Sequence, residues 1–119
     1  MSEMTLQVES NVRAPGLSRS RLASMKGTLE PHYEDVLLLV SELVSNSVRH
    51  SRSEDIDIRV STYNGRIRIE VSDDGPGFTE ESPRGDGLGL TIVEKISDRW
   101  GLVSGDRFTV WAELSRRGA

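Results

Sequence analysis

Several short segments alternate between apolar and polar residues. Residues 5–9, 56–60 and 67–71 show this period of two, which is typical of strands with one buried face. Asn64-Gly65 separates the second segment from the third, and this dipeptide is preferred in tight hairpin turns. Two further strands are predicted near the end of the chain, at residues 102–103 and 108–114. The pattern therefore predicts a hairpin within a mostly antiparallel sheet.

Three other segments carry apolar residues at helical spacing. One helix is predicted to begin at Ser18, after a break at Pro15, and to end at Pro31. A longer helix is predicted over residues 33–50 and a third over roughly residues 88–100. Helices grouped against a mostly antiparallel sheet predict an α+β fold, a two-layer sandwich.

Length and composition narrow the class of protein. The 119 residues and net charge of -4 predict one domain, residues 1–119, without the basic face of a nucleic-acid or anionic-membrane binder. The chain has no cysteine, which excludes disulfides and thiolate metal sites. With two histidines, a multi-histidine metal site is not expected. Neither a membrane-spanning run nor an export signal is visible, so a soluble, cytoplasmic protein is expected.

Polar residues recur every four positions along the long helix. Glu42, Asn46 and His50 form a stripe beside its apolar face, and the plain interpretation is a solvated helix edge. Asn46 argues against a solvated edge, because asparagine is a mediocre helix former. An amide oxygen and a carboxylate one turn apart can instead face one ligand, such as Mg²⁺, which prefers oxygen.

A second pattern lies at the end of the 67–71 strand. Asp73 shares the parity of the apolar residues before it, so its carboxylate is expected to face the buried layer. A buried carboxylate needs hydrogen-bond donors. If the Asp74-Gly75-Pro76-Gly77 turn supplies these donors, Asp73 has a structural role only. If a ligand supplies them, the amino group of adenine is a suitable donor.

A third pattern is the run Gly85-Asp86-Gly87-Leu88-Gly89-Leu90, which leads into the predicted third helix. Free N–H groups at a helix N-terminus bind anions, and glycines let phosphate oxygens approach. The run lacks the third glycine of a Rossmann fingerprint and the Gly-Lys-Ser/Thr of a Walker A loop. A structural glycine-rich turn is the alternative. Together, the three patterns describe a site for an adenine base, a metal ion and a phosphate chain.

Three segments in this order resemble a known family. ELVSNSVRH (42–50), DDGPG (73–77) and GDGLGL (85–90) are similar to the N, G1 and G2 boxes of the GHKL ATP-binding superfamily, named for gyrase, Hsp90, histidine kinases and MutL. The resemblance covers nearly the whole chain. It implies a Bergerat ATP-binding fold, which is a mixed, mostly antiparallel sheet with three helices on one face.

The resemblance also implies roles for residues at matching positions. Asn46 would hold Mg²⁺ against the phosphates of ATP, Asp73 would bind the adenine amino group, and Glu42 would act as general base. The remaining nucleotide-binding positions implied are Arg49, His50, Gly75, Gly77, Arg84, Gly85, Gly87, Leu88 and Gly89.

Among such proteins, a stand-alone domain with Glu42 most resembles the anti-sigma-factor serine kinases. These bind a sigma factor and phosphorylate a small anti-anti-sigma antagonist protein, and they are commonly homodimers. The chain departs from the kinase pattern in the lid, the loop between Gly77 and Gly85. The kinase pattern places an arginine at position 85, and the nearest arginine here is Arg84. A non-catalytic ATP-bound switch and the isolated catalytic domain of a sensor histidine kinase are the alternatives.

Overall fold

Five strands in the described part of the chain form one sheet. The computed structural model describes residues 1–50, 53–75 and 88–115. The strands lie in the order β1-β2-β3-β5-β4, and every described pair is antiparallel. Hairpins join β2 to β3 and β4 to β5. Their bounds are Ser2–Glu9 (β1), Asp55–Tyr63 (β2), Arg66–Asp73 (β3), Arg99–Val103 (β4) and Phe108–Ser115 (β5).

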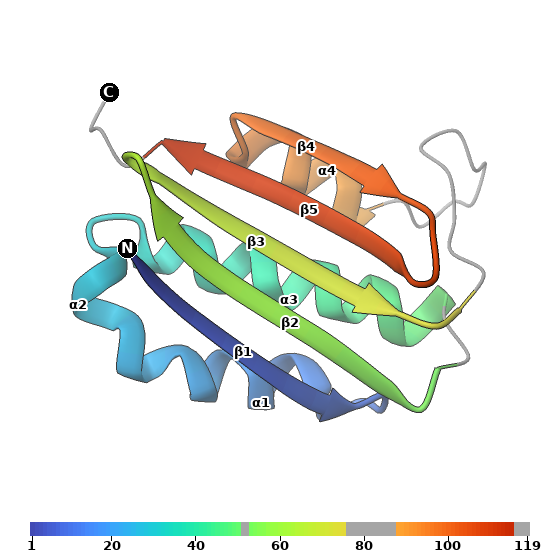
Figure 1. Cartoon of the computed structure of the whole chain (residues 1–119). Helices are drawn as coiled ribbons and strands as arrows, with labels where there is room; N and C mark the ends of the chain where they lie inside the picture. The colour runs from blue at the N-terminus through green and yellow to red at the C-terminus, as the bar shows by residue number, and fades with distance from the viewer. Residues whose placement is uncertain (51–52, 76–87, 116–119) are drawn as a thin grey trace.

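Helices cover one face of this sheet and leave the other open (Figure 1). They are α1 (Ala14–Arg21), a 3-10 turn η1 (Leu22–Met25), α2 (Lys26–Leu29), α3 (Tyr33–His50) and α4 (Leu88–Ile96). The long helix α3 contacts α1, α4 and strand β3. Acidic Glu34 and Asp35 lie in its first turn and basic residues in its last, which suits the helix dipole. The predicted α+β sandwich is confirmed.

The helices differ from the prediction in three ways. The single helix predicted between Ser18 and Pro31 is divided into α1, the 3-10 turn η1 and α2. Helix α1 begins at Ala14, because Pro15 lies in its first turn, where a missing N–H removes no helical hydrogen bond. The proline therefore opens the helix and does not break the chain. Helix α4 ends at Ile96, and Trp100 belongs to β4, where it pairs with Ala112.

The hairpin between β2 and β3 has the predicted turn. Asn64 and Gly65 have positive φ angles of 47° and 73°, as the two central residues of a type I′ turn require. This turn sets the register in which Ile58 pairs with Val71 and Val60 with Ile69. All four side chains consequently point to the same, helix-covered face.

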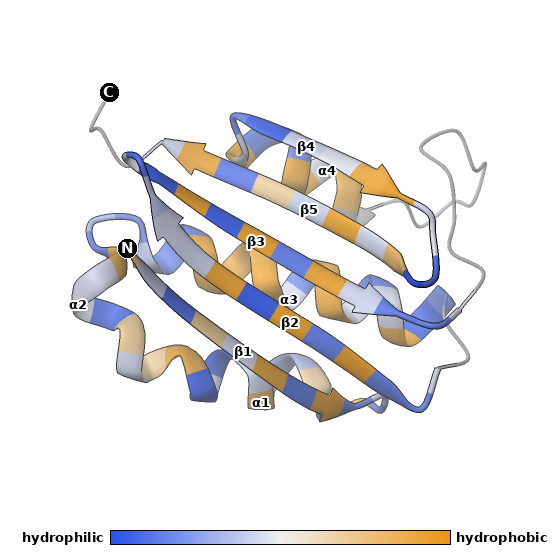
Figure 2. Cartoon of the chain, viewed as in Figure 1, coloured by the Kyte–Doolittle hydropathy of each residue, from blue (hydrophilic) through white to orange (hydrophobic). Residues whose placement is uncertain are grey.

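The core lies between the sheet and the helices. Apolar and polar residues alternate along the strands (Figure 2), and the apolar ones are buried. The main buried side chains are Val36, Leu39, Val40, Leu43 and Val44 from α3, Ile56, Ile58, Ile67, Ile69 and Val71 from β2 and β3, and Phe108, Val110 and Leu114 from β5. None of the described helices is long and apolar enough to cross a membrane.

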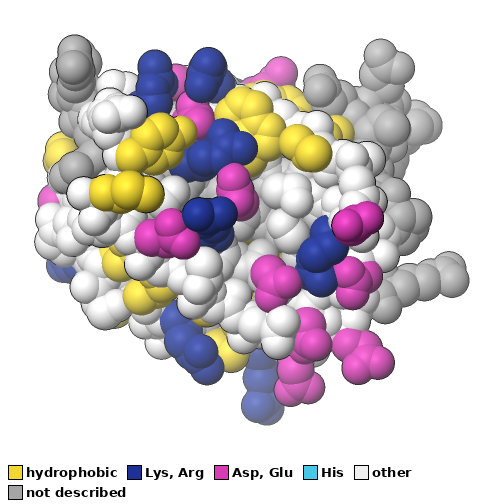
Figure 3. Space-filling view, viewed as in Figure 1, with side chains coloured by type: hydrophobic (Ala, Val, Ile, Leu, Met, Phe, Trp, Pro, Cys, Tyr) yellow, Lys and Arg dark blue, Asp and Glu magenta, His cyan; other side chains and the backbone are white. Residues whose placement is uncertain are grey.

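The open face of the sheet carries charged side chains of both signs (Figure 3). Its most buried charge is Glu113 of β5, which is 1% exposed. The Glu113 carboxylate accepts hydrogen bonds from Tyr63 of β2, Arg68 of β3 and Arg99 of β4. One carboxylate thus joins β5 to three other strands.

Candidate functional site

Asp73 places a carboxylate on the helix-covered side of the sheet. It is the last residue of β3 and is 4% exposed. Its Oδ1 accepts a hydrogen bond from the Gly75 N–H at 2.8 Å, and its Oδ2 accepts one from the Ser47 hydroxyl. Two carboxylate oxygens offer about four acceptor positions. The carboxylate is therefore held from two sides and keeps acceptor capacity for a ligand.

Ser47 ties the end of α3 to the end of β3. The serine is 5% exposed and donates directly to Asp73. Sequence reasoning did not single it out, although a signal was present. Ser47 continues the apolar series Val36, Val40, Leu43 at helical spacing, so a hydroxyl stands where the pattern places a core residue.

Asn46 is buried beside this pair, contrary to the solvated-edge interpretation. It is 3% exposed, and its Oδ1 accepts a hydrogen bond from Arg49 Nη2 at 2.8 Å. Its Nδ2 is buried and has no hydrogen-bond partner within the described part of the chain. An unsatisfied buried N–H costs about 1–3 kcal/mol. Such a group in a folded protein calls for an explanation, and a ligand that accepts its hydrogen bond is one.

The other predicted residues of α3 lie on the turns around Asn46. Glu42 is half-buried one turn earlier, Arg49 is exposed, and His50 is half-buried at the helix end. In the described residues, no group of three His, Asp or Glu side chains forms a metal site. A metal ion held here by the Asn46 oxygen would need most of its ligands from phosphates and water, which is how Mg²⁺ is usually bound. The Asn46 oxygen has a second lone pair beside its hydrogen bond from Arg49, so it fits that arrangement.

Three element ends meet on one side of the molecule. Helix α3 ends, β3 ends and α4 begins at the same end of the sandwich, on the right in Figure 1. Leu88 and Gly89 lie in the first turn of α4, where free backbone N–H groups can bind a phosphate. Gly75 follows Asp73 and donates to it. The predicted residues Gly77, Arg84, Gly85 and Gly87 lie outside the described residues.

Comparisons with known proteins identify the family of this chain. The family model of the histidine kinase-, DNA gyrase B- and HSP90-like ATPases matches residues 32–118. The serine-protein kinase RsbW of Listeria monocytogenes is 30% identical in an alignment of 102 positions, with 69% of this chain and 65% of that protein covered. The anti-sigma F factor of Clostridium botulinum is 29% identical over 117 residues, with 82% of this chain and 81% of that protein covered.

The fold recurs in a solved structure, that of the RsbU and RsbW domains of Rv1364c from Mycobacterium tuberculosis. The TM-score is 0.75 at 18% identity, with 97% of this chain and 32% of that chain covered. This likeness concerns the fold. The family match includes α3, β3 and α4, which form the candidate site. The chain belongs to the family of histidine kinase-, DNA gyrase B- and HSP90-like ATPases.

Proposed function

We propose that this chain binds Mg·ATP and is a protein kinase of the anti-sigma-factor type. It would transfer the γ-phosphate to a serine or threonine of a small antagonist protein, and it would also bind a sigma factor. The observation that carries the proposal is that two buried polar groups lie near the ends of β3 and α3, at one end of the fold. Asp73 has spare acceptor capacity and Asn46 has an unsatisfied N–H. The similarity to RsbW and to the anti-sigma F factor supports the choice of kinase.

The base-binding part of the proposal assigns Asp73 to adenine. A carboxylate fixed by Ser47 and Gly75 can accept a hydrogen bond from the exocyclic amino group of adenine. Guanine carries a carbonyl oxygen at the corresponding position, and two acceptors repel each other. The site should therefore prefer ATP to GTP.

The phosphate-transfer part assigns Glu42 and Asn46. The Glu42 carboxylate would take the proton of the substrate hydroxyl while that oxygen attacks the γ-phosphorus, and ADP leaves with the electron pair of the broken P–O bond. Asn46 would contribute the second lone pair of its amide oxygen to the metal ion, whose role when bound is to neutralise phosphate charge. Its buried Nδ2 would donate to a phosphate oxygen. Arg49 and the first turn of α4 would contact phosphates.

Nucleotide binding is tested by the thermal shift of the purified chain. A ligand that binds only the folded state at about 100 times its Kd adds about 2.7 kcal/mol of stability. Mg·ATP should therefore raise Tm by several degrees. Asp73→Asn should lose this rise, and Asp35→Asn, whose carboxylate is exposed on the first turn of α3, serves as a charge-matched control. A folded wild-type chain without any shift at millimolar Mg·ATP contradicts the proposal.

Phosphate transfer is tested separately with labelled ATP and candidate antagonist proteins. Glu42→Gln should keep the Tm rise with Mg·ATP and lose transfer by about 10²–10⁴-fold, which is the usual contribution of a general base. Glu34→Gln, on the first turn of the same helix, is the matched control and should retain transfer. Binding without transfer in the wild type would favour a non-catalytic ATP-bound switch.

A further inference from the structure

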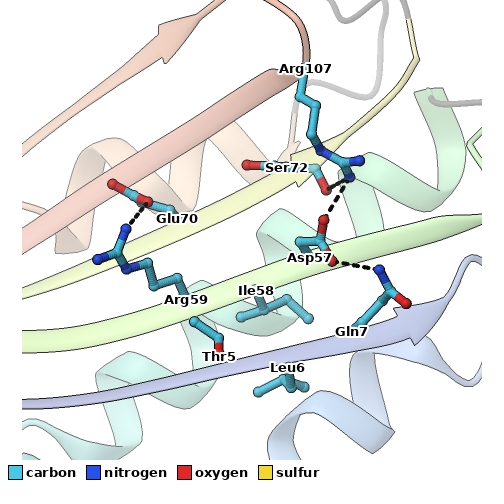
Figure 4. Close-up of a pocket in the computed structure, with 9 residues that line it drawn as sticks. All are labelled: Thr5, Leu6, Gln7, Asp57, Ile58, Arg59, Glu70, Ser72 and Arg107. Atoms are coloured by element: carbon cyan, nitrogen blue, oxygen red, sulfur yellow. Dashed lines mark hydrogen bonds and ion pairs between the residues drawn. The ribbon is translucent and has the colours of Figure 1, made fainter.

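A groove of about 540 Å³ lies on the open face of the sheet, opposite the candidate nucleotide site. Figure 4 shows its lining residues, among them Arg107, which directly precedes β5 and lies at one end of the groove. The proposed function gives Arg107 no role. Its contacts nevertheless converge on the strand end that carries Asp73.

Arg107 bonds to both chain neighbours of Asp73. Its Nη2 donates to the Ser72 carbonyl oxygen at 3.1 Å, and its Nη1 donates to Asp74 Oδ1 at 2.8 Å. Nη2 also lies 3.0 Å from Asp57 Oδ2 of β2, and Asp57 Oδ1 accepts a hydrogen bond from Gln7 of β1 at 2.9 Å. The guanidinium therefore connects the end of β3 to β2 and, through Asp57, to β1.

The geometry separates the two sides of the sheet. Successive side chains of a strand point to opposite faces, so the Ser72 side chain lies on the open face while that of Asp73 faces the helices. Arg107 lines the groove on the open face and from there reaches the Ser72 carbonyl oxygen and the exposed Asp74 carboxylate. Asp73 is the last residue of β3, and its backbone pairs with Phe108, the residue after Arg107. Beyond this pair, the strand ladder no longer fixes the chain. Arg107 supplies a restraint at the point where the ladder ends.

An ordinary surface ion pair is a poor description of Arg107. Exposed pairs contribute little, and Arg59 on the same face is such a case, since its 51% exposed side chain pairs with Glu3 and Glu70. The Arg107 side chain is only 34% exposed, and one of its acceptors is a backbone carbonyl. A planar guanidinium with several fixed donors can hold two acceptors in one orientation.

We infer that Arg107 is a positioning residue that sets the orientation of the Asp73 carboxylate from the opposite face of the sheet. This inference rests on the proposed function, because Arg107 affects nucleotide binding only if Asp73 binds the base. A small misplacement of a binding group weakens such binding. Loss of Arg107 should impair discrimination between adenine and guanine nucleotides more than it impairs folding.

The test compares Arg107→Gln with Arg59→Gln, because each removes one positive charge from the same groove. The first measurement is the NMR resonance of the Gly75 N–H, which donates to Asp73, in the nucleotide-free protein. The second is the ratio of Kd values for fluorescent ATP and GTP analogues. Arg107→Gln should shift the Gly75 resonance and reduce the preference for ATP at least tenfold, whereas Arg59→Gln should change neither.

An unchanged Gly75 resonance and an unchanged ATP preference in folded Arg107→Gln would overturn the inference. Arg107→Lys keeps the charge without the planar guanidinium and should give intermediate values, so it decides the question if the glutamine variant does not fold. If the wild type binds no ATP, the proposed function fails, and the Gly75 resonance alone still tests whether Arg107 positions Asp73.

Discussion

At the scale of single residues, the candidate site depends on a short chain of buried polar contacts. Ser47 donates to Asp73, and both side chains are at most 5% exposed. A buried acceptor that loses its donor retains its desolvation cost, so the loss exceeds that of an exposed hydrogen bond. The serine thereby couples the position of α3 to that of the carboxylate.

Ser47→Ala should accordingly lower the free energy of unfolding by about 1–3 kcal/mol and weaken ATP binding. Urea denaturation measures the first effect and titration with a fluorescent ATP analogue the second. Ser41→Ala is the matched control, because Ser41 lies on the same helix and bonds to Arg19 and to the Leu37 carbonyl oxygen, away from Asp73. Equal effects of the two variants on ATP binding would contradict the coupling.

At the scale of elements, β4 is held by a close approach of Gly101 and Trp111. A Cβ atom added at Gly101 would lie 2.9 Å from Trp111 Nε1, which is shorter than ordinary contact. The indole is in turn held by Arg68, whose guanidinium carbon lies 4.5 Å from the ring centroid. The edge strand and its neighbour therefore fit together only with a glycine at this position.

Gly101→Ala should destabilise the protein by about 1–3 kcal/mol, the usual cost of overpacking, and should change the tryptophan emission. Urea denaturation followed by fluorescence measures both. Gly27→Ala provides the control, because nothing lies within 4 Å of the added Cβ in α2. That variant should be neutral or stabilising by up to ~1 kcal/mol, since alanine favours a helix over glycine. A neutral Gly101→Ala would show that the indole moves freely.

At the scale of the whole molecule, Glu113 and its partners link four of the five strands that the structure describes. Burial alone would raise the pKa of Glu113, but hydrogen bonds from Arg99, Arg68 and Tyr63 outweigh it and lower the pKa from 4.5 to about 2. A carboxyl group with a lowered pKa in the folded state stabilises the fold above its unfolded pKa. That contribution is lost as the pH falls from about 4.5 toward 2.

The wild type should lose on the order of 2–3 kcal/mol of stability through Glu113 in this pH range. Glu113→Gln should be less stable at pH 7, and its stability should fall less between pH 4.5 and 2. Urea denaturation at a series of pH values measures both curves. Glu70→Gln removes a partly exposed carboxylate from the same face, and this variant should still lose stability between pH 4.5 and 2 as the wild type does. Parallel curves for wild type and Glu113→Gln would contradict the assignment.

Local sequence patterns determined many of the strands and turns and the face on which Asp73 lies. Alternation predicted the β2–β3 hairpin, and Asn64-Gly65 predicted its turn because both residues tolerate positive φ. Parity placed the Asp73 carboxylate on the buried face, which the structure confirms. The bounds of α1 and α4 were wrong because Pro15 suits a first helical turn and because Trp100 pairs with β5.

Only the tertiary structure decided what surrounds the candidate site. Ser47 and Asp73 are 26 residues apart, and Arg107 and Asp74 are 33 apart, so no local period relates them. The same holds for Glu113, whose partners come from three other strands. Sequence periodicity reports which face a residue occupies, because it follows from backbone geometry. Which groups meet on that face depends on strand order and register, which long-range packing fixes.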